Sequence, residues 1–340
     1  MPDLYLGIDI GGTTCAVCTG DAQGRLLGKL TIPTGKGEEG WENTVGQLLK
    51  NAERLVAAEE QSTLKATGIS CGSPMDREAG LIQEPANLPG WCDVPIVRLF
   101  QDAFPRSAVY FENDANAGVL AEYYFGVGRS TGVRNMLFLT FGTGLGAGLL
   151  LDGKLYRGTS NYAGEIGHVR LESDGPVGCG KPGSFEGFCS GGGIEQLAAV
   201  ERASWQGETC LRGEAITARD VGRGALEGDE LCRKILAISG EHLGRGLAMI
   251  IDILNPELIA IGSIFQRCEK FLRPAMEAAC EREARKQALS CCKIVPAVLE
   301  EEVGLYASLS AAYYGESILE DAASGSRPVP GIGPGSREKD

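Results

Sequence analysis

The alternation of hydrophobic and polar positions predicts two successive blocks, each with strands first and helices afterwards. The first block opens with three apolar runs, at Leu4–Ile10, Cys15–Gly20 and Leu26–Ile32. Gly and Asp residues between these runs predict tight turns, so we expect a three-stranded antiparallel meander. A helix, two strands and a second helix are predicted to follow, at Trp41–Ala58, Ala66–Cys71, Ala108–Phe111 and about Ala115–Tyr124.

The second block begins with a strand at Met136 and carries most of the predicted helices. The segment from Gly158 to Gly193 has little periodicity, and a connection of that length is uncommon unless it has a function. The residues from Ala323 to Asp340 are rich in Gly, Pro, Ser and charge, which predicts a disordered tail. The other predicted elements are long helices within Ile194–Leu254, a strand at Leu258–Ile261, a helix at Glu269–Lys286, a strand at Lys293–Val298 and a closing helix at Gly304–Tyr314.

A glycine-rich turn follows the first strand of each block. The first turn contains Gly11, Gly12 and Thr13 after Asp9, and the second contains Thr143 and Gly144. Glycine lets the backbone approach a phosphate closely, and clustered N–H groups and hydroxyls bind anions. Asp9 is placed to hold a magnesium ion, directly or through water. One such turn is equally well explained as an ordinary hairpin, but two of them favour a nucleotide-phosphate clamp.

Asp114 lies where a predicted strand meets a predicted helix. A sugar hydroxyl becomes a good nucleophile only when a base accepts its proton, and a carboxylate at the edge of a cleft suits that task. The preceding Asn113 is placed to orient a neighbouring hydroxyl. An Asp at the start of a helix more often serves only as an N-cap, so this position alone leaves both interpretations open.

Three further side chains have the chemistry of a sugar site. Carboxylates and imidazoles form paired hydrogen bonds with adjacent sugar hydroxyls, and Glu165, His168 and Glu186 supply these groups. The chain has two histidines, His168 and His242, and a structural role is the usual explanation for each. The neighbouring Glu165 favours a functional role for His168.

Composition excludes some classes of function. The chain has 340 residues, a formal net charge of -13 and 12 cysteines. No basic stretch is available to neutralise nucleic-acid phosphates, so we expect no nucleic-acid partner. Neither a signal peptide nor an apolar run of membrane-spanning length is evident. We therefore expect a cytoplasmic protein with reduced cysteines and no membrane association.

Taken in order, these motifs resemble those of the ROK family (repressor, open reading frame, kinase), within the actin, sugar kinase and Hsp70 superfamily. The resemblance extends over about residues 4 to 315. Its matching segments are Asp9–Thr13, Pro85–Trp91, Glu112–Ala117, Gly142–Gly146 and Gly164–His168. Each motif is modestly specific by itself, whereas the ordered set is highly specific.

The resemblance implies a two-lobed actin-like (ribonuclease H-like) α/β fold, with mixed sheets flanked by helices and an active site in the cleft between the lobes. Residues 1–114 and about 304–322 would form a small lobe, and residues 115–303 a large one. ATP and Mg²⁺ are the implied cofactors, and a homodimer is the implied assembly. By the same resemblance Asp114 is the catalytic base, the sugar ligands are Ser73, Asn87, Asn113, Glu165, His168 and Glu186, the phosphate turns contain Gly11, Gly12, Thr13, Thr143 and Gly144, and Gly262 lies at the adenosine edge.

The stretch from Val177 to Glu186 departs from the family pattern. The family usually holds a structural zinc with one histidine and three cysteines, but here Val177 and Ser184 stand at the first and third cysteine positions. His168 and Cys179 remain, and two ligands do not make a closed tetrahedral site. We therefore predict no structural zinc, and we expect packing of Val177 and Phe185 to replace it.

These features together predict an ATP-dependent kinase for a hexose hydroxyl, with the 6-hydroxyl of glucose as the first choice. A kinase for N-acetylmannosamine, N-acetylglucosamine, fructose or allose is one alternative, and a non-catalytic sugar-binding relative is another. Polyphosphate stays open as a donor, because a similar anion site would accept it. Retention of Asp114, Glu165, His168 and both turns favours a working enzyme.

Overall fold

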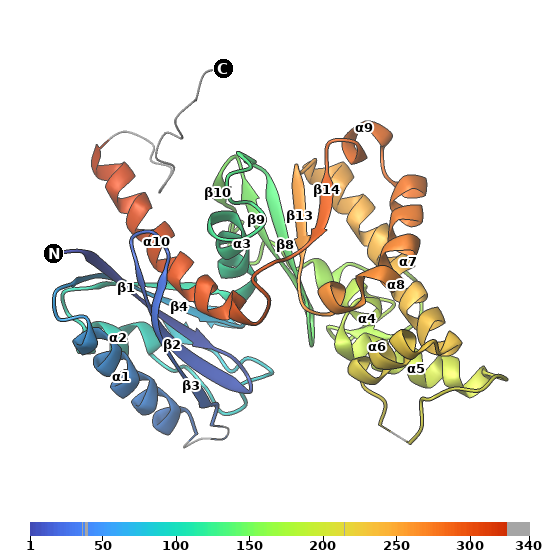
Figure 1. Ribbon diagram of the computed structural model, residues 1–340, viewed down its shortest axis with the longest axis horizontal. Coiled ribbons are helices and arrows are strands. Elements are labelled where there is room, and N and C mark those ends of the chain that lie inside the picture. Colours follow the sequence, from blue (N-terminus) through green and yellow to red (C-terminus); the bar gives the residue numbers. More distant parts are fainter. Residues whose placement is uncertain (36, 38–39, 214, 325–340) are drawn as a thin grey trace. The chain divides into compact units, whose positions relative to one another are not determined.

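The chain divides into two units in the computed structural model, which describes residues 1–35, 37, 40–213 and 215–324, with side chains to residue 317. One unit comprises residues 1–132 together with the chain from residue 301, and the other comprises residues 133–300 (Figure 1). Most of the predicted tail lies outside the described residues. Ala323 and Ser324 belong instead to the last helix, α10 (Val303–Ser324), so the helix is longer than the sequence indicated.

The first unit is built on a five-stranded sheet with the order β3-β2-β1-β4-β7. Neighbours among β1, β2 and β3 run antiparallel, as the meander predicted, whereas β4 runs parallel to both β1 and β7. The strands are β1 (Asp3–Ile10), β2 (Thr14–Asp21), β3 (Leu26–Pro33), β4 (Thr63–Cys71) and β7 (Ala108–Asn113). Parallel strands end at the same edge, so the residues that follow β1, β4 and β7 are brought together there.

Helices cover both faces of this sheet. On one face α1 (Gly40–Ala58) and α2 (Ile96–Ala103) bury Leu48 and Phe100 against the strands. On the other face α10 packs on β1 and β4, and α3 (Asp114–Tyr124) packs on α10. A sequence boundary at residue 114 placed α3 in the large lobe, whereas its contacts place it in this first unit. A small hairpin, β5 (Met75–Asp76) with β6 (Leu81–Ile82), lies on the β4–α2 connection.

The second unit repeats the same topology. Its sheet has the order β10-β9-β8-β13-β14. Strand β9 runs antiparallel to both β8 and β10, and β13 runs parallel to both β8 and β14. The strands are β8 (Met136–Phe141), β9 (Leu145–Leu151), β10 (Lys154–Leu155), β13 (Leu258–Ile261) and β14 (Lys293–Pro296). Each glycine-rich turn therefore joins the first two strands of its own sheet, which confirms the duplication seen in the sequence.

Long helices supply most of the second unit's core. The pair α7 (Glu230–Leu254) and α8 (Ile264–Glu283) packs closely, and α8 begins at Ile264 rather than at the predicted Glu269. The segment predicted to lack regular structure contains the short elements η1 (Ile166–His168), β11 (Val177–Gly178), β12 (Lys181–Pro182) and α4 (Phe185–Phe188). The remaining elements are α5 (Gly191–Ser204), α6 (Ala218–Glu227), α9 (Lys286–Leu289) and η2 (Glu300–Glu302).

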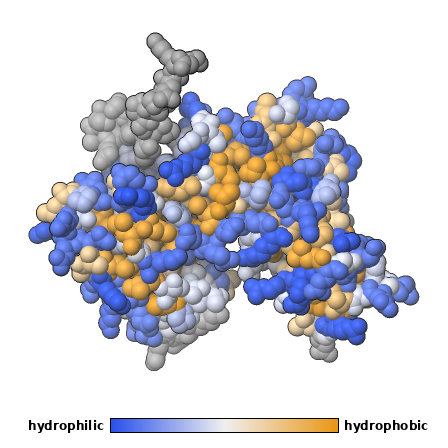
Figure 2. All heavy atoms as spheres, viewed as in Figure 1, coloured by the Kyte–Doolittle hydropathy of each residue, from blue (hydrophilic) through white to orange (hydrophobic). Residues whose placement is uncertain are grey.

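The surface is mostly polar on the face seen in Figure 2, where hydrophilic residues are interspersed with smaller apolar areas. Large exposed hydrophobic side chains include Tyr162, Val200 and Ile253. Across the part of the chain that the structure describes, none of the helices combines the length and apolar character needed to cross a membrane. The twelve cysteines all lie within the described residues and form no disulfide with one another.

Candidate active site

The first glycine-rich turn lies between β1 and β2. The Gly11 N–H donates to the Thr14 carbonyl oxygen at 3.2 Å, and the Thr34 hydroxyl donates to the Gly11 carbonyl oxygen at 2.7 Å. A Cβ on Gly12 would lie 2.6 Å from the Asn87 Cβ, so only glycine fits at this contact. The turn is therefore fixed by β3 on one side and by the loop carrying Asn87 on the other.

Asp9 sits just before this turn, near the end of β1. Burial, together with the negative charge of Asp114, raises the Asp9 pKa to about 7. A Cβ on Gly304, at the start of α10, would overlap the Asp9 carboxylate. The glycine thus leaves space for this carboxylate. The two carboxylates give this part of the unit an excess of negative charge. A bound divalent cation would compensate for that charge.

Asn113 and Asp114 divide two tasks between them at the β7–α3 junction. The Asn113 side-chain oxygen accepts hydrogen bonds from the backbone N–H groups of Ala115, at 3.0 Å, and Asn116, at 3.4 Å. Asn113 is therefore the N-cap, and Asp114 is the first helical residue. Asp114 is an exposed residue, although desolvation raises its pKa and a hydrogen bond from the Ala115 N–H opposes that rise. The interpretation of Asp114 as a simple helix cap is wrong, because its neighbour does the capping.

The other sugar-site candidates of the first unit lie beside Asp114. The Asn113 amide donates to the Ser73 hydroxyl at 2.9 Å. A Cβ on Gly72 would lie 3.6 Å and 3.7 Å from the two Asn87 amide atoms and 3.7 Å from Asp114 Oδ2. The structure thus brings Ser73, Asn87, Asn113 and Asp114 together at one edge of the sheet.

The loop that carries Asn87 is anchored by apolar side chains. Leu88 and Trp91 are fully buried, and the Trp91 indole N–H donates to the Gly35 carbonyl oxygen at 3.1 Å. Behind Asn113, the buried Glu112 carboxylate accepts from the Asn116 amide at 3.0 Å. These contacts hold the polar residues in place with side chains that do not themselves reach solvent.

The second glycine-rich turn lies at the N-terminus of α5 and near the end of β13. The Gly191 N–H donates to the Gly142 carbonyl oxygen at 2.8 Å, and Ser190 caps α5. A Cβ on Gly142 would lie 3.9 Å from the Ser263 hydroxyl, which follows Gly262 directly. The turn therefore approaches Ser263, the residue after Gly262, within this unit. Helix N-termini attract anions, so the position of α5 adds to the anion-binding character of the turn.

Glu186 contacts the same turn. Its Oε2 accepts from the Leu145 N–H at 3.0 Å, while its Oε1 accepts from the Cys179 N–H at 2.8 Å and the Cys179 thiol at 3.1 Å. Burial and the Glu186 carboxylate raise the pKa of Cys179 to about 12, so the thiol keeps its proton as a donor. A Cβ on Gly144 would lie 2.8 Å from Glu186 Oε2. The carboxylate thus links the turn to the segment that precedes it.

Glu165 precedes η1 and His168 ends it, and both have exposed side chains. The His168 Nε2 and Glu165 Oε2 atoms are 3.9 Å apart, which is too long for a hydrogen bond. Lys181 donates to the His168 carbonyl oxygen at 2.6 Å and so fixes the backbone rather than the imidazole. Both side chains are accessible to a ligand.

The segment with the altered cysteine pattern is held by hydrogen bonds. The Ser184 hydroxyl accepts from Gly178 N–H at 3.1 Å and donates to the Gly178 carbonyl oxygen at 2.9 Å. The Gln196 amide accepts from Val177 N–H and donates to the Val177 carbonyl oxygen, both at 2.8 Å. The expectation that the Val177 side chain packs in place of a metal is wrong, because it is 49% exposed.

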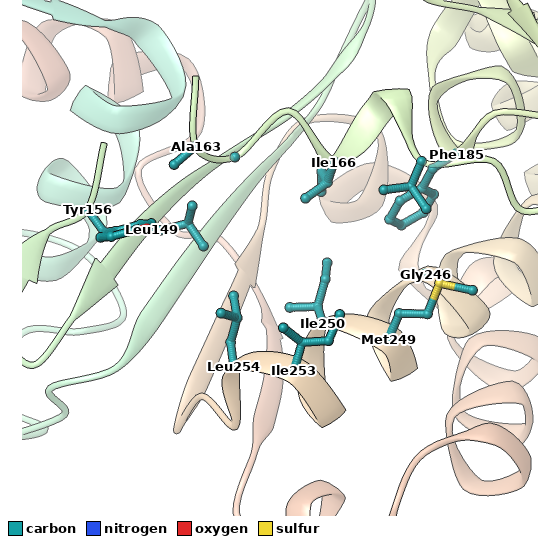
Figure 3. A pocket seen from close by; sticks show the side chains of 12 residues that line it. Leu149, Tyr156, Ala163, Ile166, Phe185, Gly246, Met249, Ile250, Ile253 and Leu254 are labelled. Atoms are coloured by element: carbon teal, nitrogen blue, oxygen red, sulfur yellow. The ribbon is translucent and has the colours of Figure 1, made fainter. Parts of the chain in front are cut away.

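Phe185, by contrast, is buried as predicted. Figure 3 shows Phe185 and Ile166 pointing toward Met249 and Ile250 of α7, where they line an apolar pocket. A Cβ on Gly246 of α7 would overlap the Phe185 ring, so the helix leaves room for it. Phe185 and Ile166 directly adjoin Glu186 and Glu165 in the sequence. Packing of these two side chains against α7 therefore holds the backbone that carries the Glu165 and Glu186 carboxylates.

Sequence reasoning missed several residues that shape the site: Gly304, Cys179 and Gln196. Gly304 touches Asp9 only because α10 docks beside β1, which no local pattern reveals. The sequence pattern explains Cys179 only as a remaining zinc ligand, so it does not indicate the hydrogen bond from its thiol to Glu186. One signal was available for Ser184, because serine is a preferred N-cap and its hydroxyl caps α4.

The paired sheets, each opened by a glycine-rich turn, define the actin-like ATPase fold. The ROK family model matches residues 5–312, and the chain belongs to the ROK family. A glucokinase from Halalkalibacterium halodurans is 31% identical over 76% of this chain and 79% of its own length. An N-acetylmannosamine kinase from Citrobacter koseri is 31% identical over 78% of this chain and 85% of its own length. A crystal structure of a ROK glucokinase from Streptomyces griseus, in complex with glucose and AMPPNP, has a TM-score of 0.70 and 26% identity and covers 91% of this chain and 99% of its own.

Proposed function

We propose that this protein is an ATP-dependent hexose kinase that phosphorylates the 6-hydroxyl of glucose, with Asp114 as the general base. The single observation that carries the assignment is the division of labour between Asn113 and Asp114. Because Asn113 caps α3, Asp114 is not needed as the cap, and its carboxylate, whose Oδ1 accepts from the Ala115 N–H, is assigned to the substrate hydroxyl. The glucokinase relatives and the ROK glucokinase bound to glucose and AMPPNP support glucose and ATP as the substrates.

In this proposal Asp114 accepts the proton of the attacking hydroxyl. Its raised pKa makes the ionised carboxylate a better proton acceptor than that of an ordinary aspartate. Asn113, Ser73 and Asn87 orient the sugar around that hydroxyl. Correct positioning of two reactants alone accounts for several kcal/mol of the barrier, so these ligands matter for turnover as well as for binding.

The second unit supplies Glu165, His168 and Glu186 as further sugar ligands in this proposal. Two of these side chains are exposed and one is held at the glycine turn, so they differ in how far they are pre-organised. Glu186 is fixed by three donors and is expected to define the sugar orientation. Glu165 and His168 are expected to adopt their final positions when the ligand binds.

The phosphates are assigned to Gly11, Gly12 and Thr13 in one unit, and to Thr143 and Gly144 in the other, with Gly262 beside the adenosine. Backbone N–H groups at such turns stabilise negative charge without the cost of reorganisation during the reaction. A magnesium ion would be held by Asp9, directly or through water, and when bound it supplies positive charge to the transferring phosphoryl group. The raised pKa of Asp9 fits this role, because a cation favours the ionised carboxylate.

The proposal is tested by measuring ADP release from ATP with a panel of sugars under matched conditions. We expect kcat/KM to be highest for glucose. N-acetylmannosamine is the second candidate, because the Citrobacter koseri kinase is as similar as the glucokinase. A higher kcat/KM for N-acetylmannosamine than for glucose would make N-acetylmannosamine the assigned substrate. Absence of ADP release with every sugar would indicate a non-catalytic protein. Parallel reactions with polyphosphate test the donor.

A further inference from the structure

A cluster of metal-ligating groups lies in the second unit, among residues that take no part in the proposed kinase site. The Cys210 and Cys232 sulfur atoms and a carboxylate oxygen of Asp229 all lie within 4.8 Å of one another. Within the described ranges, it is the one group of three or more His, Cys, Asp or Glu side chains arranged this closely. Two thiols and a carboxylate are a donor set that favours zinc and similar soft cations over magnesium or calcium.

Backbone hydrogen bonds fix the three residues relative to one another. Asp229 is the N-cap of α7, and its Oδ1 accepts from the Cys232 N–H at 2.9 Å. Its Oδ2 accepts from the Cys210 N–H at 2.6 Å. One carboxylate therefore holds both cysteine backbones, although they are far apart in the sequence. The Thr209 and Cys210 side chains also hydrogen-bond to this carboxylate, and a bound cation would take the place of the hydrogen bond with the Cys210 thiol.

Helix α6 provides the space in which the two sulfurs meet. A Cβ on Gly224 would lie 2.5 Å from Cys232 Sγ and 2.6 Å from Cys210 Sγ. Glycine inside a helix costs about 1 kcal/mol relative to alanine, so its presence here needs a reason from packing or function. Any larger residue would separate the sulfurs. Both thiols therefore lie against the α6 backbone at Gly224.

We propose that Cys210, Asp229 and Cys232 form a binding site for a thiophilic divalent cation of the zinc class, with a solvent water as the fourth ligand. The cation displaces the two thiol protons to solvent and bonds to both sulfurs and to one Asp229 oxygen. Tetrahedral bonds of about 2.3 Å to sulfur place two sulfur ligands roughly 3.8 Å apart. Small side-chain rotations are sufficient to reach this geometry from atoms already within 4.8 Å.

The two cysteines of the site differ in solvent exposure. Cys210 is exposed, so the cation has an entry path and room for a water ligand, whereas Cys232 is fully buried. Binding would connect the segment before α6 to the first turn of α7. The expected consequence is a more stable second unit, because a ligand that binds only the folded state shifts unfolding.

The site is tested by titrating chelator-treated, reduced protein with Co²⁺ and recording thiolate-to-cobalt charge-transfer absorption. We expect a band at one equivalent in the unmodified chain. Loss of a second-shell group typically weakens metal affinity by about 10- to 100-fold, so Cys210→Ser and Asp229→Asn should each weaken it by more than about 100-fold. Asn keeps the cap of α7 through its Oδ1, but its amide nitrogen cannot accept from the Cys210 N–H, so Cys210→Ser is the more direct test of metal ligation.

Matched controls separate this site from the altered loop and from incidental thiols. Cys179→Ser removes the cysteine of the altered zinc loop, and Cys291→Ser removes an exposed thiol elsewhere in the same unit. Both should retain the cobalt band and its affinity. The absence of any thiolate band in the unmodified chain would overturn the proposal. A band that survives Cys210→Ser, or one that disappears in Cys179→Ser, would overturn it as well.

Zinc analysis of the purified protein becomes decisive when these variants are included. Zinc that is lost in Cys210→Ser and kept in Cys179→Ser supports the new site. Zinc with the opposite dependence contradicts both this site and the prediction that the altered loop lacks a structural metal. Kinase turnover with saturating glucose should be unchanged in Cys210→Ser, because this residue contacts none of the groups assigned to catalysis.

Discussion

Asp9, the proposed magnesium ligand, lies in an environment that disfavours its ionised form. Its pKa is raised from 3.8 to about 7 by burial and by the charge of Asp114. Because the folded state holds this proton more tightly than the unfolded chain, the contribution of Asp9 to stability falls as pH rises from about 4 to about 7. Above that range the ionised carboxylate remains a net cost to folding.

Asp9→Asn should therefore raise the free energy of unfolding at pH 8, by roughly 4 kcal/mol, while abolishing kinase activity. The gain should diminish as pH falls and vanish near pH 4. Urea unfolding at several pH values measures it, with Asp102→Asn, an exposed position on α2, as the control. Equal stability of Asp9→Asn and the unmodified protein at pH 8 would mean that the carboxylate is not destabilised by its surroundings.

Gly304 is the glycine on which the position of Asp9 depends. Gly304→Ala should push the carboxylate aside and lower kcat/KM by about 10- to 100-fold, with more Mg²⁺ needed for half-maximal rate. Gly46→Ala in α1 is a matched control, because nothing lies within 4 Å of a Cβ there. Steady-state kinetics at varied Mg²⁺ provide the measurement. Unchanged Mg²⁺ dependence in Gly304→Ala would remove the steric role of this glycine.

At the residue scale, sequence reasoning found polar groups that stand in local motifs and missed those whose partners are remote. Asp114 was identified because it lies at a strand–helix junction, yet only the structure shows that Asn113 takes the cap. Gly304 contacts Asp9 across almost the whole chain length. No periodic pattern encodes such a contact, because it depends on how α10 docks on the sheet.

Among the elements, the segment around β11, β12 and α4 shows how a loop is held by neutral hydrogen bonds. Ser184 donates or accepts three of them, to Gly178 N–H, Gly178 carbonyl oxygen and Gly187 N–H. Buried backbone groups left without partners cost about 1–3 kcal/mol each. The loop therefore depends on a serine at a position where the family usually has a cysteine.

Ser184→Ala should lower the free energy of unfolding by about 2 kcal/mol and raise the KM for sugar more than it changes kcat. The reason is that Glu186 follows this residue in α4 and is positioned by the same backbone. Thermal unfolding and sugar kinetics measure the two effects, and Ser173→Ala, an exposed serine of the same segment, is the control. A loss of kcat with unchanged sugar KM would contradict the positioning role.

The strands of both meanders were predictable because apolar runs are separated by glycine and acidic residues. The short elements between Gly158 and Gly193 were not, since two-residue strands and a four-residue helix carry no periodicity. They are defined by hydrogen bonds from Ser184, Gln196 and Lys181 instead. Helix α8 begins before the predicted Glu269, and its start was readable from the sequence, because Ser263 and Gln266 form a capping box in which the Gln266 side chain accepts from the Ser263 N–H.

For the molecule as a whole, duplication of one topology is the main organising feature. Two blocks could be recognised from the sequence because the same turn opens each of them. The end of the first unit could not be recognised from the sequence, because α3 packs on α10 and that helix comes from the far end of the chain. The homodimer implied by the family resemblance stays a prediction, and sedimentation velocity of the purified protein tests it.

The central claim is that Asp114 is the base of a sugar kinase, and one comparison tests it most directly. Glucose-dependent ADP release is measured for Asp114→Asn beside the unmodified protein and Asp102→Asn. We predict a loss in kcat of about 100- to 10,000-fold for Asp114→Asn, the usual contribution of a general base. Glucose should still raise its unfolding temperature, since the sugar ligands remain. Near-normal turnover of Asp114→Asn would contradict the account.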